Sequence, residues 1–101
     1  MAAMLKALTE PEITAALITL PGWSGNSFGL TRTYQFADFK VALAFMHQAA
    51  PAIDASNHHP EWTNVYHRVS VILRTHDAGN QVTERDLALA RLLDHYASAV
   101  I

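Results

Sequence analysis

Along this chain, segments whose apolar residues recur at helical spacing take turns with segments whose apolar residues recur at strand spacing. This order of segments restricts the possible folds more than any other feature of the sequence. Residues 9–20, 38–53 and 83–97 carry apolar side chains at i, i+3, i+4 and i+7, which is typical of a helix with one buried face. Residues 23–36 and 62–75 are rich in strand formers and contain runs that alternate at period two. The predicted order of elements is therefore α-ββ-α-ββ-α.

Residues that favour helix ends mark the boundaries of the predicted helices. Thr9 and Glu12 form a capping box at the start of the first helix, and Asp38 and Thr83 can cap the other two. Pro51 spoils the pattern of the middle helix, because a proline there removes an amide donor and crowds the preceding turn, at a cost of about 3 kcal/mol. We therefore expect a kink at Pro51, or two shorter helices.

The predicted strands fall into two pairs with short connections, as expected for β-hairpins. Four strands joined in this way predict an α+β fold, with a four-stranded antiparallel sheet and three helices packed on one face. With 101 residues, the chain is expected to form a single domain over residues 1–101. This architecture hosts many functions and by itself indicates none of them.

Composition excludes several classes of function. The chain has no cysteine, so disulfides and thiolate chemistry are excluded and a reducing, cytoplasmic location is expected. Its formal net charge is -2 and its basic residues are scattered, which gives no support to nucleic-acid binding. No stretch resembles a signal peptide or a membrane span. Half of the residues are hydrophobic, so we expect a homo-oligomer formed through a sheet edge or a helix face.

Six histidines stand out in so short a chain, since histidine transfers protons near neutral pH and also binds metals. Two loops concentrate them: residues 57–62 precede the third predicted strand, and residues 75–79 follow the fourth. If these strands pair as a hairpin with a tight turn, the two loops meet and bring His58 and His59 close to His76. The other three histidines are expected to have structural roles.

Three further side chains near these elements have two possible roles each. Asp86 is better placed as the capping-box acid of the last helix than as a catalytic carboxylate. Asp54 lies one helical turn before the first loop histidine, and it either orients a histidine or is simply a solvated helix residue. Trp23 is a core residue or an apolar wall for a flat ligand, and the core role is favoured.

A zinc site is the rival interpretation of the loop histidines, because three histidines can bind zinc and leave one position for water. The HxH, HxxxH and HExxH spacings are absent from the sequence. Pro60 also biases His59 toward an extended backbone, so the side chains of His58 and His59 are expected to diverge. Adjacent histidines that diverge seldom bind one ion, so no metal is expected.

Several short runs of this sequence match the sequences of one family, and the distances between the runs match as well. The runs are HHPEW at 58–62, NVY at 64–66, THDAG at 75–79, FADF at 36–39 and TERD at 83–86. In these runs the sequence resembles the pterin-4a-carbinolamine dehydratases, from about Trp23 to the C-terminus. The first three runs together are highly specific, whereas any one alone is not. The resemblance implies the same α+β fold, usually assembled as a homodimer or homotetramer.

The resemblance also implies the activity, which is dehydration of 4a-hydroxytetrahydrobiopterin or a related pterin left by aromatic amino acid hydroxylases. The product is quinonoid dihydropterin, the process is tetrahydrobiopterin recycling, and no cofactor is needed. The active-site histidines of the family fall on His58, His59 and His76. The residues predicted to contact the substrate are Asp54, Pro60, Thr75, Asp77 and Trp23.

Two other functions remain open from the sequence. Animal members of this family also act as dimerisation cofactors of a homeodomain transcription factor, so a non-catalytic binding module is one alternative. A metal hydrolase with histidine ligands is the other. The presence of all three loop histidines favours the dehydratase over the binding module.

Overall fold

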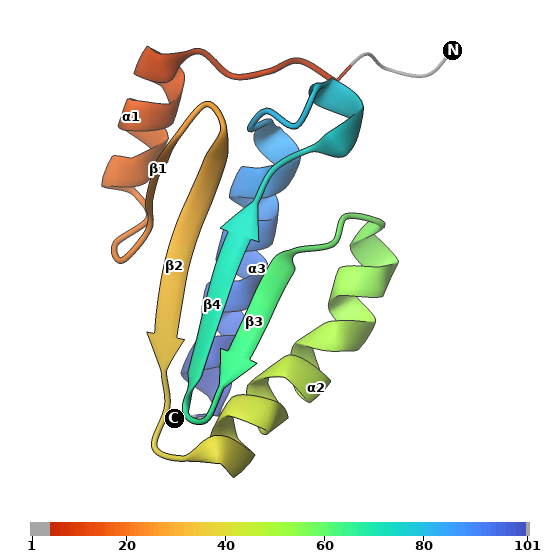
Figure 1. Cartoon of the computed structure of the whole chain (residues 1–101). Coiled ribbons are helices and arrows are strands. Elements are labelled where there is room, and N and C mark those ends of the chain that lie inside the picture. The colour runs from red at the N-terminus through yellow and green to blue at the C-terminus, as the bar shows by residue number, and fades with distance from the viewer. Residues whose placement is uncertain (1–4, 101) are drawn as a thin grey trace.

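The structure is a computed structural model that describes residues 5–100. Its helices and strands follow the predicted order α-ββ-α-ββ-α (Figure 1). In chain order they are α1 (Glu10–Ile18), β1 (Ser24–Asn26), β2 (Gly29–Gln35), α2 (Phe39–Ser56), β3 (Glu61–Val65), β4 (Arg68–Leu73) and α3 (Glu84–Ala99). A short 3₁₀ turn, η1 (His76–Ala78), separates β4 from α3. The predicted α+β class is confirmed.

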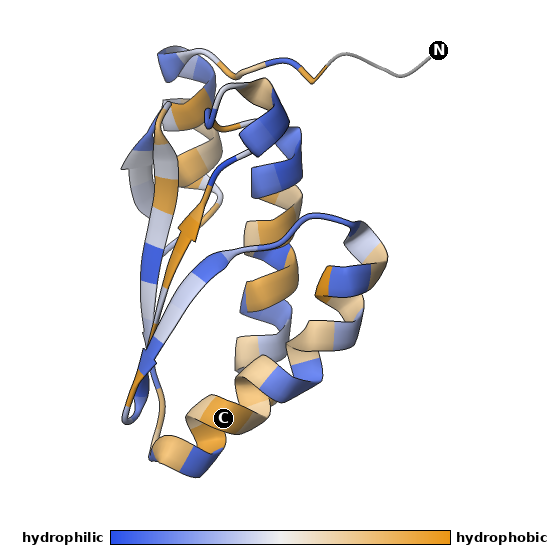
Figure 2. Ribbon diagram, turned by 45° about the vertical axis from the view of Figure 1, so that its right-hand side comes forward, coloured by the Kyte–Doolittle hydropathy of each residue, from blue (hydrophilic) through white to orange (hydrophobic). Residues whose placement is uncertain are grey.

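The four strands form one antiparallel sheet in the order β1-β2-β4-β3. Its two hairpins lie side by side because β2 pairs with β4, where Leu30 faces Leu73 and Tyr34 faces Val69. These four side chains are buried, and the residues that alternate with them along β4 face solvent, as period two requires. The helices α2 and α3 cover the buried face and leave the other face open (Figure 2).

One hydrophobic core lies between the sheet and the helices, and α1, beside the edge strand β1, adds Ile13 to it. Phe45 from α2 lies in this core with no exposed surface. The centroid of its ring is 5.0 Å from that of Tyr34, 5.1 Å from that of Phe36 and 6.0 Å from that of Trp62. Aromatic pairs in tilted or edge-to-face contact contribute about 0.5–1.5 kcal/mol beyond the area they bury, so Phe45 fixes α2 against the sheet.

The predicted helix starts are confirmed, and of the two alternatives expected at Pro51, a kink or two shorter helices, the second is excluded. Thr9 and Glu12 form both hydrogen bonds of a capping box, and the Asp38 side chain accepts a hydrogen bond from the amide of Val41. α2 runs without interruption through Pro51, so it is not split into two shorter helices. Buried residues on both sides of Pro51 hold the helix to the core and offset the missing backbone hydrogen bond. Within residues 5–100, no helix combines the length and the apolar character needed to cross a membrane.

Candidate active site

The β3–β4 hairpin brings the two histidine loops together. Glu61, the first residue of β3, pairs with Ile72 near the end of β4, so the segment before β3 meets the segment after β4. A cavity of about 260 Å³ lies between these segments and α3. The residues that line it are Asn57, His58, His59, Arg74, Thr75, His76, Asp77 and Arg85. All three histidines predicted for the site therefore line one cavity.

His58 and His59 point in different directions, as the extended bias imposed by Pro60 predicts. The side chain of His58 is 11% exposed, and its Nε2 atom lies 2.6 Å from Oδ1 of Asp86. The side chain of His59 is 58% exposed, and its Nε2 atom lies 2.8 Å from Oδ1 of Asp54. His58 is thus held against α3 by a buried contact, whereas His59 lies at the rim of the cavity.

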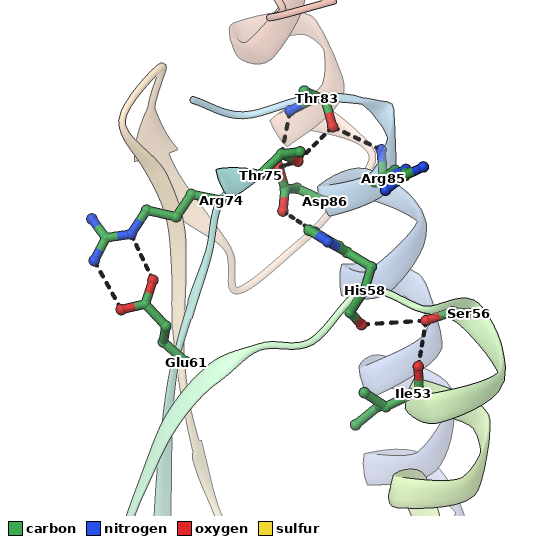
Figure 3. A network of polar contacts seen from close by, with 9 residues as sticks. All are labelled: Ile53, Ser56, His58, Glu61, Arg74, Thr75, Thr83, Arg85 and Asp86. Carbon is green, nitrogen blue, oxygen red and sulfur yellow. Dashed lines mark hydrogen bonds and ion pairs between the residues drawn. The ribbon is translucent and has the colours of Figure 1, made fainter. Parts of the chain in front are cut away.

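Asp86 connects the start of α3 to the cavity (Figure 3). Its carboxylate is fully buried, and its Oδ2 atom accepts hydrogen bonds from the amide of Thr83 at 2.9 Å and from the hydroxyl of Thr75 at 2.8 Å. The predicted capping box of α3 is therefore present. The contact of this carboxylate with His58 was not predicted, because the capping pattern shows nothing about partners that are distant in the sequence.

His76 begins η1, shortly after β4, and is an exposed residue of the cavity lining. Its Nδ1 atom lies 3.3 Å from the side-chain Oδ1 of Asn80. The loop is closed by the amide of Thr75, which donates a 3.0 Å hydrogen bond to the carbonyl of Gln81. Asn80 adopts a left-handed backbone conformation with φ of 61°, which asparagine tolerates better than most residues. The loop thereby presents His76 to the cavity.

Two arginines that the sequence analysis did not select also line the cavity. The guanidinium of Arg74 binds the carboxylate of Glu61 through two hydrogen bonds, of 2.6 and 2.9 Å, across the β3–β4 hairpin (Figure 3). These hydrogen bonds lower the pKa of Glu61 below its ordinary value. Arg85, on the first turn of α3, is the second of these arginines. In the sequence both are single charges at solvent-facing positions, and only the fold places them beside the histidines.

The structure places Trp23 away from the histidine cavity. It is buried in the core, and its indole Nε1 donates hydrogen bonds of 3.0 and 3.1 Å to the carboxylate of Asp94 on α3. The same carboxylate accepts hydrogen bonds from Arg32, at 3.0 Å, and from the hydroxyl of Tyr34. Burial, together with this hydrogen bond, raises the pKa of the Tyr34 phenol. These contacts fit the core role favoured for Trp23, and none of them reaches the histidines.

Of the other residues predicted to contact the substrate, two line the cavity and two do not. Thr75 and Asp77 line it, although the hydroxyl of Thr75 is directed to Asp86. Asp54 reaches the site only through His59, and Pro60 is not among the lining residues. In the part of the chain that the structure describes, no group of three or more histidine, cysteine, aspartate or glutamate side chains could hold a metal ion.

Comparison with known proteins gives consistent similarities over nearly the whole chain. The family described as "Pterin 4 alpha carbinolamine dehydratase" matches residues 6–96. Proteins named "Putative pterin-4-alpha-carbinolamine dehydratase" from Opitutus terrae and Rhodopseudomonas palustris are 50% and 46% identical to this chain. The matches cover 83% of this chain and 87% of the first relative, and 94% of this chain and 95% of the second.

A solved structure from Brucella melitensis is similar in fold as well as in sequence. That protein is described as a "transcriptional coactivator/pterin dehydratase". The two structures superpose with a TM-score of 0.85 at 44% sequence identity. The superposition covers 91% of this chain and 99% of the other, so the two folds correspond over almost their full lengths.

Proposed function

Because this chain belongs to the pterin-4a-carbinolamine dehydratase family and is therefore a hydro-lyase, we propose that its histidines dehydrate 4a-hydroxytetrahydrobiopterin, or a related 4a-hydroxytetrahydropterin, by general acid–base catalysis. The observation that carries this proposal is the convergence of His58, His59 and His76 on one cavity. The cavity, of about 260 Å³, is close to the lower end of the usual range for small-molecule sites, about 300–1,000 Å³. A pterin is a small bicyclic ring and suits a cavity of this size.

Dehydration requires one proton to be added and another to be removed. The bond between C4a and the hydroxyl oxygen breaks, and the hydroxyl takes a proton and leaves as water. The N5–H bond breaks as well, and its electrons form the C4a=N5 double bond of the quinonoid product. Histidine suits both transfers, since its ordinary pKa is about 6.5, and a positioned acid or base contributes about 10²- to 10⁴-fold. The reaction as proposed needs no cofactor.

The proposed role is recycling of tetrahydrobiopterin in the cytoplasm, in functional coupling with an aromatic amino acid hydroxylase that supplies the 4a-hydroxypterin. The word coactivator in the description of the Brucella melitensis protein makes a binding role the second candidate. The three histidines at the cavity support the enzyme, because a binding module has no need of converging proton-transfer groups.

We expect the purified protein to accelerate quinonoid dihydropterin formation from 4a-hydroxytetrahydropterin, followed by absorbance. The rate should exceed that of buffer by at least about 10²-fold, which is the contribution of one positioned acid or base. Treatment with EDTA should leave this rate unchanged. Activity that disappears with EDTA and returns with zinc would replace the proposed mechanism by metal catalysis, and a rate equal to that of buffer would favour the binding role.

We also infer that the chain acts as a homodimer or homotetramer. The helix α2 exposes Phe39 and Leu43, and beside Leu43 lies a hollow of about 580 Å³, which is also lined by Met46. The strand β3 lies at the edge of the sheet and exposes Val65, so its unpaired edge is a second surface for self-association. Light scattering at tens of micromolar protein should give a multiple of 11.1 kDa. A stable mass of 11.1 kDa at that concentration would contradict the inference.

A further inference from the structure

We propose that Asp86 fixes the tautomer of His58, so that Nδ1 of His58 is the nitrogen that takes the proton from the pterin. This inference deepens the proposed function and rests on it only for the identity of the substrate. Its structural part is that Nε2 of His58 carries a hydrogen and Nδ1 carries a lone pair. That part concerns the protein alone and can be tested without any pterin.

The groups around the Asp86 carboxylate determine which nitrogen of His58 carries the hydrogen. Asp86 is fully buried, and its Oδ2 atom receives the amide of Thr83 and the hydroxyl of Thr75. The backbone amide can only donate, and an ionised carboxylate only accepts. Oδ1 then also accepts, and the group 2.6 Å away is Nε2 of His58. Nε2 therefore carries the hydrogen of this contact.

The other nitrogen of the His58 ring, Nδ1, is left without a hydrogen. Neutral imidazole carries a hydrogen on one nitrogen and a lone pair on the other, so with Nε2 protonated the lone pair is at Nδ1. Within residues 5–100, no hydrogen bond of the protein is made to Nδ1 of His58. Because His58 lines the cavity, this free nitrogen is the acceptor available to a bound pterin. His58 is thus a base, and Asp86 is its positioning residue.

Nδ1 of His58 takes the proton of N5–H, and the electrons of that bond form C4a=N5 as the hydroxyl leaves. The imidazolium that forms is stabilised by the buried carboxylate of Asp86, as in other histidines paired with a buried aspartate. His76 lines the cavity and has no carboxylate partner among residues 5–100, and it supplies the proton that converts the hydroxyl into water. One proton is taken up and one is released, so the charges balance.

The variant Asp86→Asn tests this assignment, because the surroundings determine which way the new amide lies. The amide of Thr83 can only donate, so the side-chain oxygen of the asparagine has to face it and continues to accept from Thr75. The NH₂ group then faces Nε2 of His58, and a neutral His58 has to accept there. The variant keeps the helix cap and forces the opposite tautomer, with the hydrogen on Nδ1.

Nitrogen-15 NMR of histidine-labelled protein, at about pH 8 where an ordinary histidine is neutral, reports the tautomer directly. We expect a protonated Nε2 and a bare Nδ1 at His58 in the unmodified protein, and the reverse in Asp86→Asn. The variant should lose about 10²- to 10⁴-fold in kcat with little change in KM, since the comparable exchange in the Ser-His-Asp triad costs about 10⁴-fold. Glu84→Gln removes the same charge from an exposed position in the same helix turn and should retain kcat.

The spectrum of the unmodified protein keeps the test decisive even if Asp86→Asn does not fold. A bare Nε2 at His58 in that spectrum would overturn the assignment. An Asp86→Asn protein with reversed tautomer and full kcat would show that Nδ1 is not the reacting nitrogen. If the tautomers are as expected but the unmodified protein turns over no 4a-hydroxytetrahydropterin, the proposed function fails while the role of Asp86 toward His58 stands.

Discussion

Replacing both His58 and His76 by alanine should reduce the rate of pterin dehydration to that of the uncatalysed reaction in buffer. The two side chains line the same cavity from different segments, and each is proposed to transfer one of the two protons. A single positioned acid or base contributes about 10²- to 10⁴-fold, so each single variant should lose about that factor. The double variant removes the proposed base and the proposed acid together and leaves only His59, which lies at the rim of the cavity. Initial rates, followed by absorbance of the quinonoid product, measure the effect.

The control for this experiment is the variant His95→Ala. This histidine is exposed on α3 and is not among the residues that line the cavity. Removing it makes the same chemical change outside the site, so kcat and KM should remain within about twofold of the unmodified values. Full activity in the His58→Ala, His76→Ala protein would show that these histidines are not catalytic.

Truncating Phe45 to alanine should lower the free energy of unfolding by about 3–5 kcal/mol. The side chain has no exposed surface and contacts the rings of Tyr34, Phe36 and Trp62. Its removal therefore forfeits both the transfer free energy of the ring and the contacts of the atoms around the new cavity. A domain of this size has a total stability of about 5–15 kcal/mol, so the variant should lose a large share of it.

Urea unfolding followed by circular dichroism measures this change. The matched control is Phe28→Ala, because the Phe28 side chain is 67% exposed and its loss should change stability by about 0.5 kcal/mol or less. A loss below about 1 kcal/mol for Phe45→Ala would mean that the core is not packed around this ring as described.

Much of the fold could be predicted from the sequence because local signals and the hydrophobic pattern agree. The capping residues Thr9, Asp38 and Thr83 act on their own backbone, and the period of the apolar residues distinguishes helix from strand. Of the two alternatives predicted at Pro51, the split into two helices does not occur, because packing overrides the local rule. Proline removes one hydrogen bond, whereas the neighbouring buried residues of α2 hold the helix to the core.

The site was predictable only as far as chain topology determines it. Pairing of β3 with β4 necessarily brings the ends of that hairpin together, so the convergence of His58 with His76 follows from the order of the elements. The partner of His58 does not follow, because Asp86 comes from a helix whose rotation and depth depend on the whole core. Trp23 shows the same limit, since its partner Asp94 is 71 positions away in the sequence.

Position 86 has to satisfy two geometric requirements with one short side chain. A glutamate is an accepted third residue of a capping box, so the start of α3 alone would allow it. Its additional methylene, however, would move the carboxylate by more than a bond length inside a site with no free surface, and the 2.6 Å contact with His58 could not persist unchanged. An uncharged asparagine could not replace Asp86 either, because the imidazole of His58 would then adopt the opposite tautomer. The start of a helix and the proposed tautomer of a ring on the loop before β3 are therefore not separately adjustable in this molecule, and aspartate meets both demands.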